Sequence, residues 1–418
     1  GNGYDADGAF GQLNDLWRFS VSTGKWIWVG GSDKVNAQPV YGTLGVASVV
    51  NDPGARHAAI SWTDNRGKFW MFGGQGYYSD LWQFDPAEGV WTWMGGSAVP
   101  NEPGVYGTLG ASSTANRPGA RAYGQGWTDA LGNLWLFGGD GVDGYGNSGP
   151  LNDLWKFDTV RKDWTWMGGS DEKNKSGIYG VPGQQSAGNI PGSRRGSTGW
   201  RAANGDLWLF GGTSIGPDGF AERDDLWRIV LEKKVSVDPI FTWLAGTNTF
   251  NAPGVYESKG TPSPASYPGS RTVAAGWTDA LGNFWMYGGA RAKDNVGGYD
   301  LLDDLWRYTP GTGLWTWESG TSTGNQTPVY GLKGVAAQEN RPGARLSSMS
   351  WIGSSGDLWI FGGGVFGSGE SNDLWKYNVR TGLWTWLTGG SGASAGNYGI
   401  KGTGSPSAVP GARSLGAA

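Results

Sequence analysis

The chain has 418 residues, a formal net charge of −4 and only 16% charged residues. A surface that follows nucleic-acid phosphates needs clustered Lys and Arg, so nucleic acid is excluded as an expected partner. There is no Cys, which excludes disulfides and thiol catalysis. No apolar run approaches the roughly 20 residues that cross a membrane. The 78 Gly and 27 Trp favour many short strands, tight turns and aromatic packing between sheets.

Two short motifs recur along the chain, each in six copies spaced 65–79 residues apart. The first is Asp-Leu-Trp, followed in most copies by a turn and a Trp-x-Trp segment. The fourth copy has Phe241 and Trp243 there instead, after an insertion at 230–239. The second motif is Gly-x-Arg. The repeated residues are Asp15, Asp80, Asp153, Asp225, Asp304 and Asp373 together with Arg56, Arg121, Arg194, Arg271, Arg345 and Arg413.

One unit, residues 119–170, shows what each copy is expected to form. After Gly-x-Arg it predicts a strand that ends at Trp127, a turn at 129–132 and a strand at 134–137. A Gly-Gly pair and a loop rich in Gly and Asp come next, then a strand at 152–157 and a strand around 164–166. Alternating bulky and small residues between turn signals predict one antiparallel sheet of four strands.

Self-similar four-stranded units predict a β-propeller, because one such sheet cannot bury both faces alone. The paired Gly after an apolar strand, the Asn-Asp-Leu-Trp segment and the outer-strand Trp resemble kelch repeats, and the resemblance covers essentially the whole chain. It implies an all-β, six-bladed kelch-like propeller in a single domain, 1–418. Five complete blades are expected at 54–97, 119–170, 192–247, 269–321 and 344–390.

The sixth blade is expected to be shared between residues 411–418 and 1–32. Aligned on the other repeats, it lacks the piece that corresponds to 127–138. Either the natural chain continues and supplies this piece, or a neighbouring chain adds a strand by β-augmentation. The second alternative predicts self-assembly.

Antiparallel order places two kinds of short turn on one face of the propeller and two kinds of long loop on the other. Long loops on a rigid scaffold are where binding usually resides, so the long-loop face is the expected binding surface. The Trp residues all occupy repeat positions, which favours packing over sugar stacking. The repeated Arg and Asp favour structural pairs within each blade over a ring that binds an anion.

The loops between the second and third strands differ among repeats and combine carboxylates, Gly and aromatic residues. Such loops suit a carbohydrate surface, and Asp-x-Asp-Gly clusters also suit Ca²⁺, although Asp and Gly are ordinary turn residues. Calcium is expected, if present, at Asp5, Asp7, Asp140 and Asp143. The ligand-binding candidates are Tyr4, Asp5, Asp7, Asp140, Asp143, Tyr145, Asp218, Phe220, Asp294, Tyr299 and Asp300.

Two enzyme families with propeller folds provide a comparison for catalytic residues. The galactose oxidase family, of kelch type, needs two His, two Tyr and a Cys for copper. This chain has only His57 and no Cys, so copper is not expected. The segment 63–70 is similar to the Asp-containing turns of sialidases, but Asp64 and Gly67 are three residues apart instead of two. No spacing identifies a catalytic residue.

The sequence therefore predicts a non-catalytic, secreted or cell-surface microbial propeller that binds a glycan or protein on its long-loop face. One alternative is a structural subunit of a surface layer or fibre, closed by a neighbour's strand. The other is a hydrolase or lyase that acts on a polysaccharide through paired carboxylates.

Overall fold

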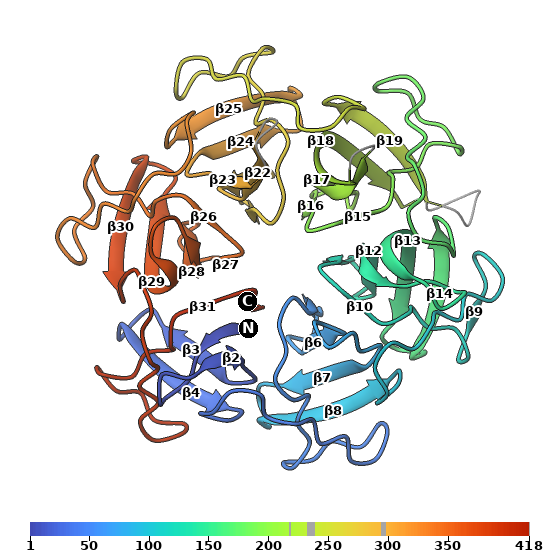
Figure 1. Cartoon of the computed structure of the whole chain (residues 1–418), viewed down its shortest axis with the longest axis horizontal. Coiled ribbons are helices and arrows are strands. Elements are labelled where there is room, and N and C mark those ends of the chain that lie inside the picture. The colour runs from blue at the N-terminus through green and yellow to red at the C-terminus, as the bar shows by residue number, and fades with distance from the viewer. Residues whose placement is uncertain (217–218, 232–238, 294–297, 418) are drawn as a thin grey trace.

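The computed structural model describes residues 1–216, 219–231, 239–293 and 298–417. These residues form strands and loops and no helix, and hence no helix that could span a membrane. The all-β prediction is confirmed. Small antiparallel sheets stand around a central axis, which is the arrangement of a β-propeller, and the two chain ends lie side by side near that axis (Figure 1).

Each repeat forms its own set of strands, with the last strand at the rim (Figure 1). The first two sets are β5 (Ile60–Thr63), β6 (Phe69–Phe72), β7 (Leu81–Asp85), β8 (Val90–Gly95), and then β9 (Ser112–Ser113), β10 (Arg121–Ala122), β11 (Gln125–Thr128), β12 (Leu134–Val142), β13 (Ser148–Asp158), β14 (Asp163–Gly168). The third is β15 (Arg194–Arg195), β16 (Thr198–Arg201), β17 (Leu207–Gly216), β18 (Gly219–Val230), β19 (Ile240–Ala245).

The fourth set is β20 (Ala275–Thr278), β21 (Phe284–Tyr287), β22 (Ala290–Ala292), β23 (Tyr299–Leu301), β24 (Leu305–Thr309), β25 (Leu314–Ser319). The fifth is β26 (Arg345–Leu346), β27 (Met349–Ile352), β28 (Leu358–Val365), β29 (Gly369–Asn378), β30 (Leu383–Thr388). The two chain ends supply β1 (Asn2–Tyr4), β2 (Phe10–Gln12), β3 (Leu16–Ser20), β4 (Lys25–Gly30) and β31 (Arg413–Ser414).

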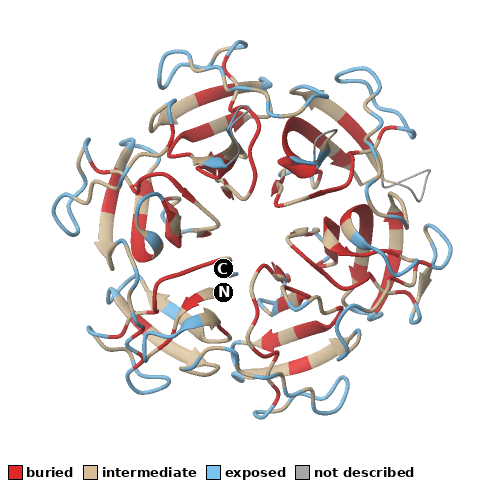
Figure 2. Ribbon diagram, in the orientation of Figure 1, coloured by how far each residue is buried: buried red, intermediate tan, exposed pale blue. Residues whose placement is uncertain are grey.

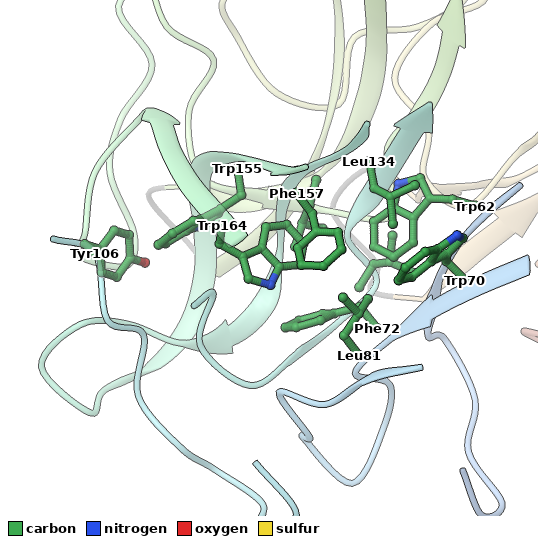
Figure 3. Close-up of a cluster of buried hydrophobic side chains, with 11 residues drawn as sticks. Trp62, Trp70, Phe72, Leu81, Tyr106, Leu134, Trp155, Phe157 and Trp164 are labelled. Atoms are coloured by element: carbon green, nitrogen blue, oxygen red, sulfur yellow. The ribbon is translucent and has the colours of Figure 1, made fainter. Parts of the chain in front are cut away.

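The hydrophobic core lies between neighbouring sheets. One cluster joins side chains of β5 to β7 to side chains of the next sheet: Trp62, Trp70, Phe72 and Leu81 against Leu134, Trp155, Phe157 and Trp164 (Figure 3). The indole Nε1 of Trp62 also donates to the carbonyl of Trp135 at 2.8 Å. Large aromatic rings fill the space between twisted sheets and keep their polar atom bonded. The repeated Trp residues of this cluster are packing residues.

A buried ion pair holds each repeat together. In the second sheet Arg121 and Asp153 form two parallel bonds of 2.7 Å, and Arg121 Nη1 also donates to the carbonyl of Gly138 at 3.0 Å. Tyr106 and Trp155 donate to the same carboxylate at 2.7 Å. The other five repeats pair the corresponding residues: Arg56–Asp80, Arg194–Asp225, Arg271–Asp304, Arg345–Asp373 and Arg413–Asp15.

The electrostatics of these pairs follow from burial and charge. Burial alone would raise the pKa of Asp225, but the adjacent Arg194 outweighs burial and holds that pKa below its ordinary value. Burial, followed by the charge of Asp153, raises the pKa of Tyr106, which therefore stays a donor. Each buried charge is compensated by its hydrogen-bonded partner, as the low-dielectric interior requires.

A closed ring of backbone hydrogen bonds surrounds the axis. It contains the second residue after each repeated Arg, and each N–H donates to the carbonyl of the preceding ring member at 2.7–3.0 Å. All members have left-handed backbone with φ between 50° and 65°, a conformation that costs L-residues such as Val273 free energy. The hydrogen bonds offset that strain. The members are Ala58, Tyr123, Gly196, Val273, Ser347 and Leu415.

The long loops that join one sheet to the next cover strand edges. β9 in one such loop pairs with the outermost strand β14, and Ser48, Ser263 and Ala337 make single bridges to the outer strands of their sheets. An uncovered edge strand would invite association with other chains. A Tyr in every such loop donates to the repeated Asp of the sheet it covers: Tyr41, Tyr106, Tyr179, Tyr256, Tyr330 and Tyr398. These tyrosines anchor the loops to the framework, and ligand binding on the long-loop face stays a prediction.

The sheet built from the two chain ends has an open space. β31 pairs with β1 and β1 with β2, but β3 pairs only with β4. Cavities of about 270 and 300 Å³ flank β3. Trp17 of β3 is half-buried, whereas the corresponding Trp82, Trp155, Trp227, Trp306 and Trp375 are 0% exposed. β3 and β4 lie mostly in the intermediate class in Figure 2.

Replacing Asp153 by Ala should lower the free energy of unfolding by about 3–5 kcal/mol, because Arg121 would stay buried without its partner. The shift in urea midpoint measures this loss. Glu172→Ala, at an exposed carboxylate, is the control. The double variant Arg121→Met/Asp153→Leu should recover part of the loss, and equal midpoints for Asp153→Ala and wild type would contradict the role given to the pair.

Candidate functional site

The residue that follows each repeated Arg differs from repeat to repeat, although the backbone ring that it precedes is the same in all six. This position directly precedes the axial ring, at the start of the innermost strand, so it lies beside the axis on the long-loop face. The residues there are His57, Ala122, Arg195, Thr272, Leu346 and Ser414. A position that the repeat does not constrain can serve binding or catalysis.

Three sheets contribute to a polar cluster around Arg195. Arg195 Nη1 lies 3.1 Å from Asp140 Oδ2 of β12, and the hydroxyl of Tyr77 donates to the same oxygen at 3.1 Å. The guanidinium carbon lies 4.5 Å from the ring centre of Phe220 in β18. The Arg195 and Asp140 side chains are 31% and 15% exposed, so solvent and ligands reach the pair.

Glu222 adds a second carboxyl group next to Arg195. Thr213 of β17 pairs with both Arg195 and Glu222, so the three side chains share one face of the sheet. Glu222 is buried, and its Oε2 accepts from the backbone N–H of Ala292 at 3.1 Å. Its Oε1 has no hydrogen-bond partner among the described residues. Burial raises the pKa of Glu222.

Tyr299 lies beside this carboxyl group. It pairs across β22 and β23 with Ala292, the residue that donates to Glu222, and its side chain is half exposed. Burial, followed by the charge of Glu222, raises the pKa of Tyr299. Phe220 and Tyr299 thus present aromatic surface next to polar groups, which suits the alternating apolar and hydroxyl faces of a sugar.

The two carboxyl groups have different environments. Asp140 is bonded to a cation and a phenol, whereas Glu222 is buried with no cation within 4.0 Å among the described residues. A buried carboxyl group retains its proton more readily than a paired one. Two carboxyl groups with opposed environments are the elements of acid–base catalysis at a glycosidic bond.

Asp5 and Asp143 stabilise loop backbone. Asp143 Oδ1 accepts from the N–H groups of Tyr145 and Asn147 at 2.9 and 2.8 Å, and Asp5 Oδ1 accepts from Asp7 and Ala9 at 2.9 Å. Burial alone would raise both pKa values, but these backbone donors outweigh burial and hold both pKa values below the ordinary range. Both residues form the turns that their type favours.

The other candidates are spread over the long-loop face. Tyr4 packs edge-on against Phe10 at 5.1 Å, Asp7 pairs with Lys34 at 2.6 Å, and Tyr145 donates to Asp171 at 3.3 Å. Asp300 accepts from Asn325 at 2.6 Å and lies 3.4 Å from Lys293. Asp218 and Asp294 lie outside the described residues. Of the candidates, the structure brings together Asp140, Phe220 and Tyr299.

A calcium ion at Asp5, Asp7, Asp140 and Asp143 stays a prediction. The structure divides these residues into two pairs on different sheets, where each carboxylate already has protein partners. No group of three or more His, Cys, Asp or Glu side chains with metal-binding spacing occurs in the described ranges. Calcium would therefore have to draw on backbone oxygens and water as well.

Tyr77, Arg195 and Glu222 are not among the site residues predicted from the sequence. Arg195 directly follows a repeated Arg, at the position that varies between repeats, and that variation is the signal that could have identified it. Glu222 lies three residues before the repeated Asp225, where three other repeats have Pro150, Leu301 and Gln12. Tyr77 gives no comparable signal.

Comparisons with known proteins show similarity to an enzyme in sequence and to a solved structure in fold. No protein-family model matches the chain. A xyloglucanase from Paenibacillus sp. is 28% identical over 213 residues, which are 50% of this chain and 17% of that protein. The solved structure of YjhT is similar with a TM-score of 0.52 and 13% identity, over 90% of this chain and 98% of YjhT. The similarity to YjhT shows the fold alone. The chain spans only 17% of the length of the xyloglucanase.

Replacing Glu222 by Gln removes a carboxyl group whose pKa burial raises. Such a group favours the folded state at low pH, and the advantage is lost as pH rises through its folded pKa. The stability of Glu222→Gln relative to wild type should therefore increase as pH rises from about pH 4, near the ordinary pKa of Glu, through the raised pKa of folded Glu222. Urea midpoints across this range measure the difference, with the exposed Glu88→Gln as baseline. A difference that is constant with pH would contradict the assignment.

Proposed function

We propose that the chain is a six-bladed, kelch-like β-propeller that hydrolyses a polysaccharide bound around Arg195, Asp140 and Glu222. The blade count is supported by the axial ring, which takes one residue from each of six repeats, and by the six Arg–Asp pairs. Five blades have four main strands, and the sixth is shared between the chain ends and is incomplete.

The observation that carries the hydrolytic function is the pair of carboxyl groups on either side of Arg195. Asp140 is partly exposed in an ion pair, and Glu222 is buried with a raised pKa. Glycoside hydrolysis uses one carboxyl group as acid and a second as base or nucleophile. Similarity to a xyloglucanase over half the chain supports a polysaccharide as substrate.

A non-catalytic glycan-binding function is the second candidate. It is favoured by the complete burial of Glu222, which separates this carboxyl group from the surface, while Phe220 and Tyr299 are about half exposed beside it. Rings at a rim next to polar groups bind sugars without chemistry. Both functions suit a secreted or cell-surface protein. An assembly in which a neighbouring chain closes the shared blade is a separate proposal that rests on the cavities around β3.

Turnover of a glycan panel that includes xyloglucan, measured as release of reducing ends, tests the proposal. Replacing Asp140 by Asn should lower kcat/KM by about 100-fold or more, because general acid–base groups contribute that much. Glu88→Gln, on the short-turn face, keeps the fold and removes an unrelated carboxylate. Undiminished turnover by Asp140→Asn would overturn the site. Binding of a glycan by wild type without any turnover would establish the second candidate instead.

A further inference from the structure

One repeat carries a charged residue where others carry a buried aliphatic one. Two residues before the repeated Asp, three repeats have Leu13, Leu151 and Leu302, which are at most 1% exposed, and two have Tyr78 and Ser371. The third full repeat has Arg223 there, and its side chain is also buried, with 6% of the residue exposed. A buried guanidinium destabilises the fold unless its charge is compensated. Its presence at an aliphatic position therefore requires an explanation.

The contacts of Arg223 leave its charge without an anion. Its Nη1 donates to the carbonyls of Asn248 and Thr249 at 2.9 and 3.3 Å, and the guanidinium carbon lies 3.6 Å from the ring centre of Phe250. Its Nε is buried with no hydrogen-bond partner among the described residues. No described carboxylate lies within 4.0 Å of the Arg223 guanidinium, and the nearby Asp225 is paired with Arg194. Burial lowers the pKa of Arg223.

Arg223 lines a cavity of about 480 Å³, which we call the Arg223 pocket. Lys175, whose ammonium group pairs with the exposed Glu172 outside the lining, contributes a second cation. Asn174, Ser176 and Ser214 contribute amide and hydroxyl groups. None of the described residues that line the pocket is an acid. The lining thus carries two cations and no carboxylate in a chain of net charge −4. Its electrostatics favour an anionic ligand.

A second change in the same repeat favours the same ligand. Aligned on the Gly-Gly pair, Gly216 of this repeat occupies the position of Asp5 and Asp143 in two others. There the carboxylate accepts from the N–H of Val35 or Lys173, in the loop that leads to the next sheet. Gly216, which lines the Arg223 pocket, brings no carboxylate. Compared with the two repeats that have Asp5 and Asp143, this repeat has an additional cation, Arg223, and lacks the carboxylate, and both changes lie at the Arg223 pocket.

We propose that the Arg223 pocket binds the carboxylate of an acidic sugar residue, a uronate, in a polysaccharide. The guanidinium group of Arg223 and the ammonium group of Lys175 bind the carboxylate, because charge-assisted hydrogen bonds from such cations to a carboxylate are strong. Asn174, Ser176 and Ser214 bind sugar hydroxyl groups. The carboxylate assignment rests on the geometry of Arg223, and the assignment to a sugar rests on the proposed function.

Isothermal titration with tri-galacturonate tests this site without requiring turnover. The methyl ester of the same trisaccharide is the matched ligand, since esterification removes only the charges. Wild type should bind the free acid at least about tenfold more tightly than the ester, a difference of about 1.4 kcal/mol. Equal affinity for both would overturn the proposal, and tighter binding of tri-glutamate than of tri-galacturonate would overturn the sugar assignment.

Arg223→Leu restores the residue of three other repeats and should reduce affinity for the free acid at least about tenfold, toward that of the ester. Arg228→Leu, on the same strand β18, is the control for loss of one positive charge, because Arg228 pairs with Asp206 outside the pocket. If Arg223→Leu does not fold, Lys175→Ala, whose side chain is 41% exposed, should still show a severalfold loss. Wild-type affinity in these variants would overturn the site.

The result of the uronate-binding experiment can be distinguished from the result of the hydrolysis experiment. Asp140→Asn should lose turnover and keep the affinity of the Arg223 pocket, because Asp140 does not line it. Failure of turnover in wild type with intact binding of the uronate would leave the pocket established and remove only the hydrolytic function.

Discussion

The buried pair between a repeated Arg and a repeated Asp is the interaction on which the rest of this fold depends. Each pair joins the start of the innermost strand to the start of the third strand, and the Arg also bonds the carbonyl of the paired Gly. The same carboxylate accepts from a Trp of its own sheet and from a Tyr of the incoming loop. One carboxylate therefore fixes two strands, one loop and one core side chain. Its full satisfaction by donors is what makes a buried charge tolerable.

The repeated framework determines where function can lie. The tyrosine loops bond the framework and cover the outer strands, so much of the long-loop face is structural. The repeat does not fix the identity of the residue that directly follows each repeated Arg, beside the axial ring, or of a few residues near the paired Gly. Arg195, Asp140, Glu222 and Arg223 all occupy such positions in two neighbouring sheets. Departures from a structural repeat mark candidate sites in this molecule better than the repeated residues do.

Much of the fold could be predicted from the sequence, because strand length, turn residues and the Arg–Asp motif are local and periodic. The candidate site could be predicted only in part. Asp140, Phe220 and Tyr299 were found among loop carboxylates and aromatics, but so were Asp5 and Asp143, which bond their own loops. Sequence cannot separate these cases, since a turn-forming Asp and a ligand-binding Asp have the same neighbours along the chain.

The sequence by itself determined the all-β class and the positions of the repeated Arg, Asp and Trp residues. Only the tertiary structure decided which variable residues meet. Arg195 and Asp140 are 55 residues apart and lie on different sheets, yet they form a hydrogen-bonded ion pair at 3.1 Å. Whether Arg223 has an anion, and whether Glu222 is buried, also depends on loops from neighbouring repeats. Those contacts depend on how the sheets close around the axis, and that geometry is not encoded within any one repeat.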